Sequence, residues 1–469
     1  MTTLIPRNES SPMDTAKLES FVFEKMSSSR LPGLSLALVK DGDVVYARGF
    51  GQADIGKSRA ATPQTLYGAA SITKSFVAIA ILQLAERGLL AVSDPVEKFV
   101  PCPIPSKGGA TIRLEHLLTH TSGMPALAYI EAVLRHAHGI GGCPLPIGTP
   151  RDVLTFVHGS DDWAETAPGE RWFYLNEGYV LLGEIIAKVS GQPYDQYITE
   201  NILRPLEMSR SFFAEADVTR GDGGEHLATP YVLPRGGGPP RAGRYLYNVL
   251  GGDAALITTA LDLARYAAMF LRRGEGVMSD ASFDAMIRPR VPLPSRPMPE
   301  LWGNAPATPP RPSHYGFGVS ISDDFLGETL IGHAGSLIVS TSYVGFMPRS
   351  NVGVAVLTNG NGYAMPQLAK VALAVLLDRD PHAELAFLKT EKVLKDLSGF
   401  YETYRGTLKA KVTRDGEFLR VEYLCGDQSP GTTTLVPEYL DGPSRGSTPS
   451  PKVPDNPPSS ERPATAGRS

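Results

Sequence analysis

The chain has 469 residues, of which 42% are hydrophobic and 20% charged, an ordinary composition for a globular protein. Its formal net charge of -4 excludes the basic footprint of a nucleic-acid-binding protein. The three cysteines are scattered without metal-ligand spacing, which argues against a disulfide scaffold or a zinc site. No stretch has the length of a signal peptide core or a membrane span. We therefore expect a cytoplasmic protein with no nucleic-acid or membrane partner, no metal and no cofactor.

The N-terminal part of the chain predicts an amphipathic helix, a hairpin and then a long apolar helix: residues 14–26, 34–40, 44–48 and 71–87. Asp41-Gly42 lies between the two strands and is a strong hairpin signal. Gly88 follows the apolar helix at a favourable position for a C-terminal cap.

Further elements follow along the chain. Helices are predicted at residues 114–118, 177–189, 259–271 and 368–377, and a second strand pair at residues 343–348 and 352–357. Strands at both ends with helices between them predict an α+β domain over residues 15–385, in which the terminal strands share a sheet. Two Pro/Gly-rich segments, 233–240 and 292–312, interrupt the pattern. Long loops of this kind either form functional rims or are disordered, and the sequence leaves both open.

The composition changes after residue 391. Residues 391–440 predict a partial β domain with short strands at 397–404, 407–413 and 418–423. This segment is too short for a closed eight-stranded barrel of the usual size. Residues 441–469 consist mainly of Pro, Ser, Gly and Arg, and we expect this tail to be disordered.

Ser71-Ile-Thr-Lys74 is the S-x-x-K motif of the chain. Three residues make about one helical turn, so Lys74 lies on the same face as Ser71. A hydroxyl nucleophile needs a base to take its proton, and a lysine among apolar side chains can serve because desolvation disfavours its charged form. The alternative is a capping serine beside a surface lysine, and the spacing alone does not decide between the two.

Two further segments carry side chains that suit the same chemistry. Tyr174-Leu-Asn176 offers a phenol that can relay protons and an amide that can bond both a lysine and a substrate. His333-Ala-Gly335-Ser336 leads into a strand, where the histidine provides a donor and the glycine permits close approach to the backbone. These segments follow Ser71 in order, which favours a catalytic interpretation of the S-x-x-K motif.

Over about residues 15–385 the chain resembles the β-lactamase-like serine hydrolases of the penicillin-recognising superfamily, in the class C-like branch with D-aminopeptidases and CubicO-type esterases and peptidases. The resemblance implies an antiparallel sheet flanked by helices with an all-helical subdomain. Residues 397–424 resemble the start of the small β-barrel appended to some CubicO-type peptidases. The motifs that carry the main resemblance are 68–74, 117–123, 174–183, 206–208 and 332–335.

The resemblance implies a role for each motif residue. Ser71 would be the acylated nucleophile, Lys74 and Tyr174 the base and proton relay, and His333 the side chain of the third motif. Asn176 would orient Lys74 and the substrate, and Gly335 and Ser336 would line the substrate site. The backbone N–H groups of Ser71 and Ser336 would form the oxyanion hole.

The third motif departs from the Lys-Thr-Gly of most β-lactamases, because this chain has His333-Ala-Gly335. We therefore expect hydrolysis of small-molecule esters or peptide-like amides through an acyl-serine, with efficient β-lactam hydrolysis in doubt. The alternatives are an acyltransferase that uses the same serine, and a non-catalytic penicillin-binding-like ligand sensor. His116 and His120 are four residues apart and could be read as a metal pair, but no third ligand is in sight and the resemblance makes His120 structural.

Overall fold

The structure is a computed structural model. It describes residues 13–142, 144–220, 223–234, 237–247, 249–294, 313–415, 418–424 and 432–435. The expected tail at 441–469 and most of the loop at 292–312 lie outside these residues. The described residues form two compact units, the first running to Glu384 and the second beginning at Leu385.

The first unit is built on a nine-stranded sheet that is antiparallel throughout. Its strands, in sheet order, are β3 (Arg59–Ala60), β2 (Asp43–Asp54), β1 (Gly33–Lys40), β13 (Val352–Thr358), β12 (Ser340–Met347), β11 (Glu328–Leu337), β10 (Ser320–Phe325), β9 (Ser313–Tyr315) and β8 (Val291–Pro292). β1 pairs with β13 over seven residues, with Leu36 opposite Val356. The two ends of the predicted domain therefore share one sheet, as expected.

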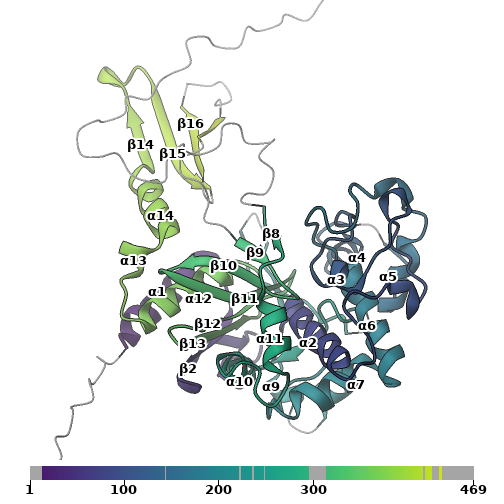
Figure 1. The fold of residues 1–469 in the computed structure, drawn as a ribbon. Helices are drawn as coiled ribbons and strands as arrows, with labels where there is room; N and C mark the ends of the chain where they lie inside the picture. Colours follow the sequence, from purple (N-terminus) through teal and green to yellow (C-terminus); the bar gives the residue numbers. More distant parts are fainter. Residues whose placement is uncertain are drawn as a thin grey trace, which may run out of the picture. The chain divides into compact units, whose positions relative to one another are not determined.

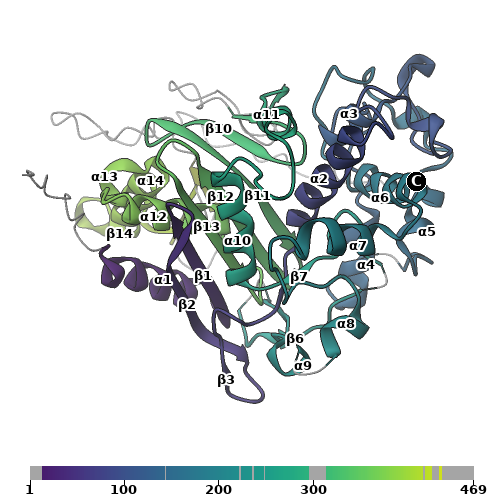
Figure 2. The same ribbon diagram turned by 60° about the horizontal axis from the view of Figure 1, so that its bottom comes forward.

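Helices cover both faces of this sheet, with α1 (Thr15–Ser29) and α12 (Met365–Leu376) on one side and α10 (Ala260–Leu271) on the other (Figures 1 and 2). Every residue of β12 and β13 is buried. This double burial explains why Val352 to Leu357 is a continuous run of apolar residues and glycine instead of an alternating pattern.

A helical region packs beside the sheet, and α2 (Thr73–Glu86) lies between the two (Figure 1). All α2 residues from Thr73 to Leu84 are buried, and the helix contacts α6, α7 and α11. The expected fold, an antiparallel sheet flanked by helices with an all-helical subdomain, is confirmed. The helices of this region and its surroundings are α3 (Leu114–Leu118), α4 (Tyr129–Ala137), α5 (Pro150–Val157), α6 (Asn176–Ser190), α7 (Tyr194–Ile198), α8 (Glu215–Thr219), α9 (Gly223–His226) and α11 (Asp280–Ile287).

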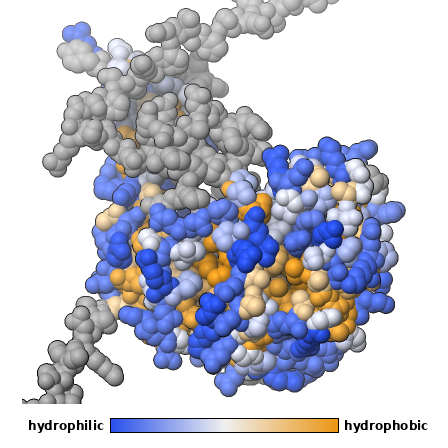
Figure 3. Space-filling view, in the orientation of Figure 1, coloured by the Kyte–Doolittle hydropathy of each residue, from blue (hydrophilic) through white to orange (hydrophobic). Residues whose placement is uncertain are grey.

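Two short strand pairs complete the first unit, namely β4 (Tyr67–Gly68) with β7 (Ile257–Thr258) and β5 (Tyr231–Val232) with β6 (Arg241–Ala242). The β4–β7 pair matters for the site, because β4 leads directly into the turn that carries Ser71. Hydrophilic residues cover most of the visible face of this unit, with apolar residues exposed between them (Figure 3).

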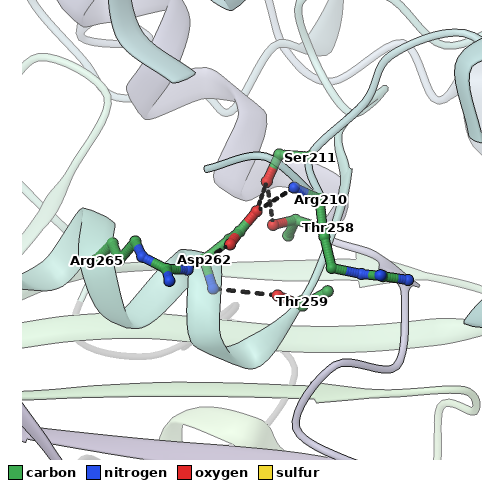
Figure 4. Close-up of polar contacts among 6 residues, drawn as sticks. All are labelled: Arg210, Ser211, Thr258, Thr259, Asp262 and Arg265. Carbon is green, nitrogen blue, oxygen red and sulfur yellow. Dashed lines mark hydrogen bonds and ion pairs between the residues drawn. The ribbon is translucent and has the colours of Figure 1, made fainter. Parts of the chain in front are cut away.

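A buried carboxylate joins the start of α10 to the segment before residue 212 (Figure 4). Asp262 accepts hydrogen bonds from the backbone N–H of Arg210 at 2.9 Å and from Ser211 Oγ at 2.9 Å. It also pairs with Arg265 at 2.8 Å. Thr259 Oγ1 caps the helix by accepting the N–H of Asp262 at 3.1 Å. This cluster fixes where α10 begins, next to β7.

The second unit contains α14 (Ala386–Asp396) and a four-stranded antiparallel sheet in the order β14 (Gly399–Glu402), β15 (Lys409–Asp415), β16 (Phe418–Tyr423) and β17 (Thr432–Leu435). The first three strands overlap those expected from the sequence. Sequence analysis did not find α14 or β17. Within the described residues, no helix combines the length and apolar character that a membrane span requires.

Candidate active site

Ser71 lies in a single 3₁₀ turn, Ala70–Ile72, immediately before α2. The helix therefore begins two residues later than the sequence predicts. Ala70 has a φ of 52°, in the left-handed region that is unfavourable for a residue with a side chain. The turn is held by Thr73, whose hydroxyl donates to the carbonyl of Ala70 at 2.7 Å. Ser71 is partly exposed although the flanking Ala70 and Ile72 are buried.

Lys74 is fully buried, and its amine is surrounded by three acceptors. Nζ is 3.1 Å from Ser71 Oγ, 2.8 Å from Asn176 Oδ1 and 2.8 Å from the backbone carbonyl oxygen of Asp253. The S-x-x-K spacing thus does bring the serine and lysine into contact. The third acceptor comes from the loop before β7, which sequence analysis did not connect with the site.

Tyr174 approaches Lys74 through its ring, whose centroid is 4.9 Å from Nζ. Tyr179 lies on another side, with its ring centroid 5.6 Å from the same atom. In the part of the chain that the structure describes, no hydrogen bond joins the Tyr174 hydroxyl to Ser71 or Lys74. Its role as a proton relay therefore stays a prediction.

His120 holds the segment Tyr174-Leu-Asn176 in place through a hydrogen bond and a ring contact. Its Nδ1 accepts the backbone N–H of Leu175 at 3.1 Å, and its ring packs 4.2 Å from the ring of Tyr174. Complete burial and the nearby charge of Lys74 hold the pKa of His120 well below its usual value. His116 instead accepts the N–H of Arg113 through Nδ1 at 3.1 Å. Among the described residues, no group of three or more His, Cys, Asp or Glu side chains could hold a metal ion.

Asn176 begins α6 and faces both Lys74 and α4. Its Oδ1 accepts from Lys74, and its Nδ2 donates to Glu131 Oε1 at 2.9 Å. The two contacts together fix which end of the amide points to the lysine. Glu131 lies on a separate helix, and sequence analysis did not single it out.

Two buried carboxyl groups flank Lys74 in addition to these contacts. Asp253 is fully buried, and its Oδ1 accepts the N–H of Gly251 at 2.9 Å. Burial raises the pKa of Asp253, although the charge of Lys74 opposes the rise. Glu177 is 1% exposed, and burial raises its pKa to about 7, with the negative charges of Glu131 and Asp253 adding to the effect. Glu177 lies within the 174–183 motif but sequence analysis gave it no role, and Asp253 lies outside the motifs.

His333 is buried on β11, and both its ring nitrogens have partners. Nδ1 lies 2.6 Å from the carbonyl oxygen of Ala334, so it carries the proton, and Nε2 then accepts from the Tyr315 hydroxyl at 2.8 Å. Burial, with a smaller contribution from Lys74, lowers the pKa of His333 to about 3. The histidine is therefore neutral, and its ring nitrogens are engaged by Ala334 and Tyr315.

Gly335 lets β11 pass very close to the turn that holds Ser71. A Cβ atom at this position would lie 2.1 Å from the carbonyl oxygen of Ala69. Ser342 on the neighbouring strand donates its hydroxyl to that same oxygen at 2.7 Å. The glycine therefore serves the packing of β11 against the turn that carries Ser71. Ser336, one residue on, is exposed.

A pocket of about 170 Å³ opens above Ser71. Its polar lining includes Glu131, Asn176, Ser336 and Asn361. Four aliphatic side chains also line it, and Arg135, Asp253 and Ala254 complete the lining. The aliphatic residues are Ile130, Leu134, Leu337 and Ile338. The pocket thus unites three of the motif residues predicted from the sequence with residues of α4, which the sequence did not assign to the site.

Comparison with known proteins shows what this arrangement is similar to. The sequence model described as Beta-lactamase matches residues 18–378, and one described as Pab87 octamerisation domain matches residues 381–449. The octameric penicillin-binding protein homologue from Pyrococcus abyssi is 41% identical, with a TM-score of 0.83 and 92% of each chain covered.

Two more distant relatives extend this comparison. Protein flp of Staphylococcus aureus (strain MW2) is 29% identical over 358 residues, which span 76% of this chain and 65% of that protein's length. A D-stereospecific amidohydrolase from Streptomyces sp. shares the fold, with a TM-score of 0.59, 23% identity and coverage of 79% of this chain and 100% of that one.

Proposed function

Because the chain belongs to the Beta-lactamase family, we propose that it is a serine hydrolase that cleaves esters or peptide-like amides through an acyl-serine at Ser71. The single observation that carries this proposal is the contact of Lys74 Nζ with Ser71 Oγ, at 3.1 Å, on the floor of a pocket. An accessible hydroxyl beside a buried amine is the arrangement that nucleophilic catalysis requires.

The surroundings of Lys74 suit a base. Asn176 Oδ1 and the Asp253 carbonyl oxygen can only accept, so they take two N–H bonds of a neutral amine. The remaining position of the amine, its lone pair, then faces Ser71 Oγ. In this geometry Lys74 accepts the serine proton as Oγ forms its bond to the substrate carbonyl carbon.

The remaining steps follow from the same contacts. The backbone N–H groups of Ser71 and Ser336 are proposed to stabilise the oxyanion. The bond from the carbonyl carbon to the leaving oxygen or nitrogen then breaks, and that atom takes the proton from Lys74, directly or through Tyr174. Water attacks the acyl carbon and gives a proton to Lys74. The bond from this carbon to Ser71 Oγ then breaks, Oγ takes the proton back from Lys74, and the acid is released.

A fluorophosphonate probe tests this proposal directly. We expect one mass label, located at Ser71 by peptide mapping, and loss of hydrolysis of p-nitrophenyl butyrate in Ser71→Ala with an unchanged melting temperature. Labelling at another serine, or full activity of the alanine variant, would refute the assignment. Adding a competing alcohol to the assay separates hydrolysis from acyl transfer, because a transferase would yield mainly the new ester.

The two matched segments also support proposals on organisation. We propose a hydrolase domain at residues 15–385 followed by a separate β domain, in a cytoplasmic protein. We further propose that the second unit mediates self-association. The match of residues 381–449 to an octamerisation domain supports this, as does the octameric state of the Pyrococcus abyssi homologue.

A further inference from the structure

Glu131 places a carboxylate in the active-site pocket that the steps above do not use. It is exposed on α4, and its Oε1 accepts the Nδ2 of Asn176 at 2.9 Å. In the part of the chain that the structure describes, its second oxygen, Oε2, has no hydrogen bond and no ion pair. One carboxylate oxygen is thus held in place, and the other is available to a bound molecule.

The other carboxyl groups and the amine around Glu131 are less available. Lys74 on α2 is buried and bonded to three acceptors. Glu177 on α6 and Asp253, in the loop before β7, are buried carboxyl groups. Arg135 follows one turn later on α4, and its Nη2 donates to the carbonyl of Ile140 at 3.0 Å. An accessible carboxylate therefore lies on the side of the pocket next to Asn176.

Glu131 is also close to the reacting serine through a continuous chain of contacts. Ser71 Oγ is 3.1 Å from Lys74 Nζ, Nζ is 2.8 Å from Asn176 Oδ1, and the same amide group reaches Glu131. The lining also has aliphatic side chains, from Ile130 and Leu134 on the same helix and from Leu337 and Ile338, and the pocket of about 170 Å³ has room for a small acyl group. A substituent next to the scissile carbonyl therefore meets aliphatic side chains or this carboxylate.

We propose that Glu131 is a specificity-determining residue that selects substrates with an ammonium group close to the scissile carbonyl, and disfavours substrates with an anionic group there. This inference rests on the proposed function and narrows its substrate class. A carboxylate–ammonium hydrogen bond in the pocket favours the cation, and the same charge repels a carboxylate. We expect kcat/KM to be highest for the cationic substrate, lower for the neutral one and lowest for the anionic one.

The test compares three alanine p-nitroanilides, as both enantiomers, that differ only at nitrogen: the free amine, the N-acetyl and the N-succinyl compound. Glu131→Gln keeps an acceptor for Asn176 Nδ2 and removes only the charge. We expect the ratio of kcat/KM for the amine over the acetyl substrate to fall about tenfold or more, as for hydrogen bonds to charged groups. The succinyl-to-acetyl ratio should rise. Glu97→Gln, which removes an exposed charge outside the pocket, should change neither ratio.

The pH dependence gives an independent readout. An α-amino group has a pKa near 8, so in the wild type the amine preference should be present at pH 6.5 and fade above pH 9. Using the acetyl substrate as denominator cancels the titration of Lys74, Glu177, Asp253 and other groups of the enzyme. A preference that does not change with pH, or equal losses on all three substrates in Glu131→Gln, would overturn the proposal. Equal losses would make Glu131 a positioning residue for Asn176.

A binding measurement separates failure of this inference from failure of the proposed function. In Ser71→Ala, alaninamide should bind more tightly than N-acetylalaninamide by calorimetry, and Glu131→Gln in that background should remove the difference. If the wild type hydrolysed none of the anilides but this difference appeared, the inference would stand and the hydrolase proposal would not. If both ligands bound equally, the inference would fail whatever the activity.

Discussion

His333 occupies the third motif without supplying a charge. Its pKa of about 3 lies below the ordinary value near 6.5, so in the folded state it stays neutral above about pH 4. A depressed histidine pKa contributes stability that is present above pH 6.5 and is lost as pH falls towards 3. The consequence for binding is that no cation stands at this position to receive the carboxylate of a β-lactam.

We therefore predict that the NMR ring signals of His333 do not titrate between pH 5 and 8. The buried contacts with Tyr315 and the Ala334 carbonyl account for this behaviour. In the same range nitrocefin should be hydrolysed more slowly than p-nitrophenyl butyrate. If His333 titrated near pH 6.5, it would not be held neutral by its buried contacts. If nitrocefin were hydrolysed faster than p-nitrophenyl butyrate, the absence of a cation at this position would not limit β-lactam hydrolysis.

Glu177 allows a stability prediction with a definite sign. Its pKa rises from 4.5 unfolded to about 7 folded, so its ionisation weakens the folded state as pH rises through that window. Glu177→Gln should therefore stabilise the protein at pH 8 by ~3 kcal/mol, at ~1.4 kcal/mol per pKa unit, and have little effect near pH 4.5. Urea unfolding at both pH values measures this. Glu184→Gln on the same helix is the control, and an equal effect of Glu177→Gln at both pH values would contradict the prediction.

Sequence analysis identified the site residues that lie in short motifs and missed those that come together only by folding. The three-residue spacing of Ser71 and Lys74 is local, and the structure places Lys74 Nζ against both Ser71 Oγ and Asn176 Oδ1. The third partner of Lys74 is the backbone carbonyl of Asp253, and a pattern of side chains in the sequence cannot predict a backbone contact. Glu131 lies on an exposed face of α4, where glutamate is common, so the sequence gives no sign that this one lines the pocket.

At the scale of elements, a long apolar run was informative even where the element is buried on all sides. The apolar run before Gly88 predicts α2 well, but its first turn is 3₁₀ because Ala70 adopts a positive φ to turn the chain from β4. The predicted break at residue 391 falls inside α14, whose buried Leu388 and Leu394 lie in an otherwise polar sequence. β17 is a short exposed strand that joins the sheet by pairing with β16, a long-range contact that local sequence does not reveal.

The Asp262 cluster gives a prediction at this scale. Asp262→Ala would leave the buried Ser211 hydroxyl and the Arg210 N–H without this acceptor, next to the start of α10 (Figure 4). We expect a loss of about 2–4 kcal/mol in the free energy of unfolding, measured by urea titration. Asp284→Ala, which removes an exposed ion pair with Arg273, should cost under about 1 kcal/mol. Equal losses in the two variants would show that the cluster does not hold α10.

At the scale of the whole molecule, the first unit contains every strand of the nine-stranded sheet and both of its covering layers. The pairing of β1 with β13 joins the beginning and the end of this unit. All residues of the candidate site also belong to it. Removing the chain from Leu385 onward therefore takes away no strand of this sheet and no side chain of the pocket.

We predict that a protein ending at Glu384 folds, reacts with a fluorophosphonate at Ser71, and has the mass of a monomer in light scattering. The full chain should have a larger mass, because the second unit is proposed to mediate self-association. Its four-stranded sheet exposes large apolar side chains such as Phe400 (76% exposed) and Leu435 (48%), and β14 and β17 are its edge strands among the described residues. Phe400→Ser in the full chain keeps the strand but removes one such contact, and should shift the mass towards the monomer. A truncated protein that kept the larger mass would place the assembly surface in the first unit instead.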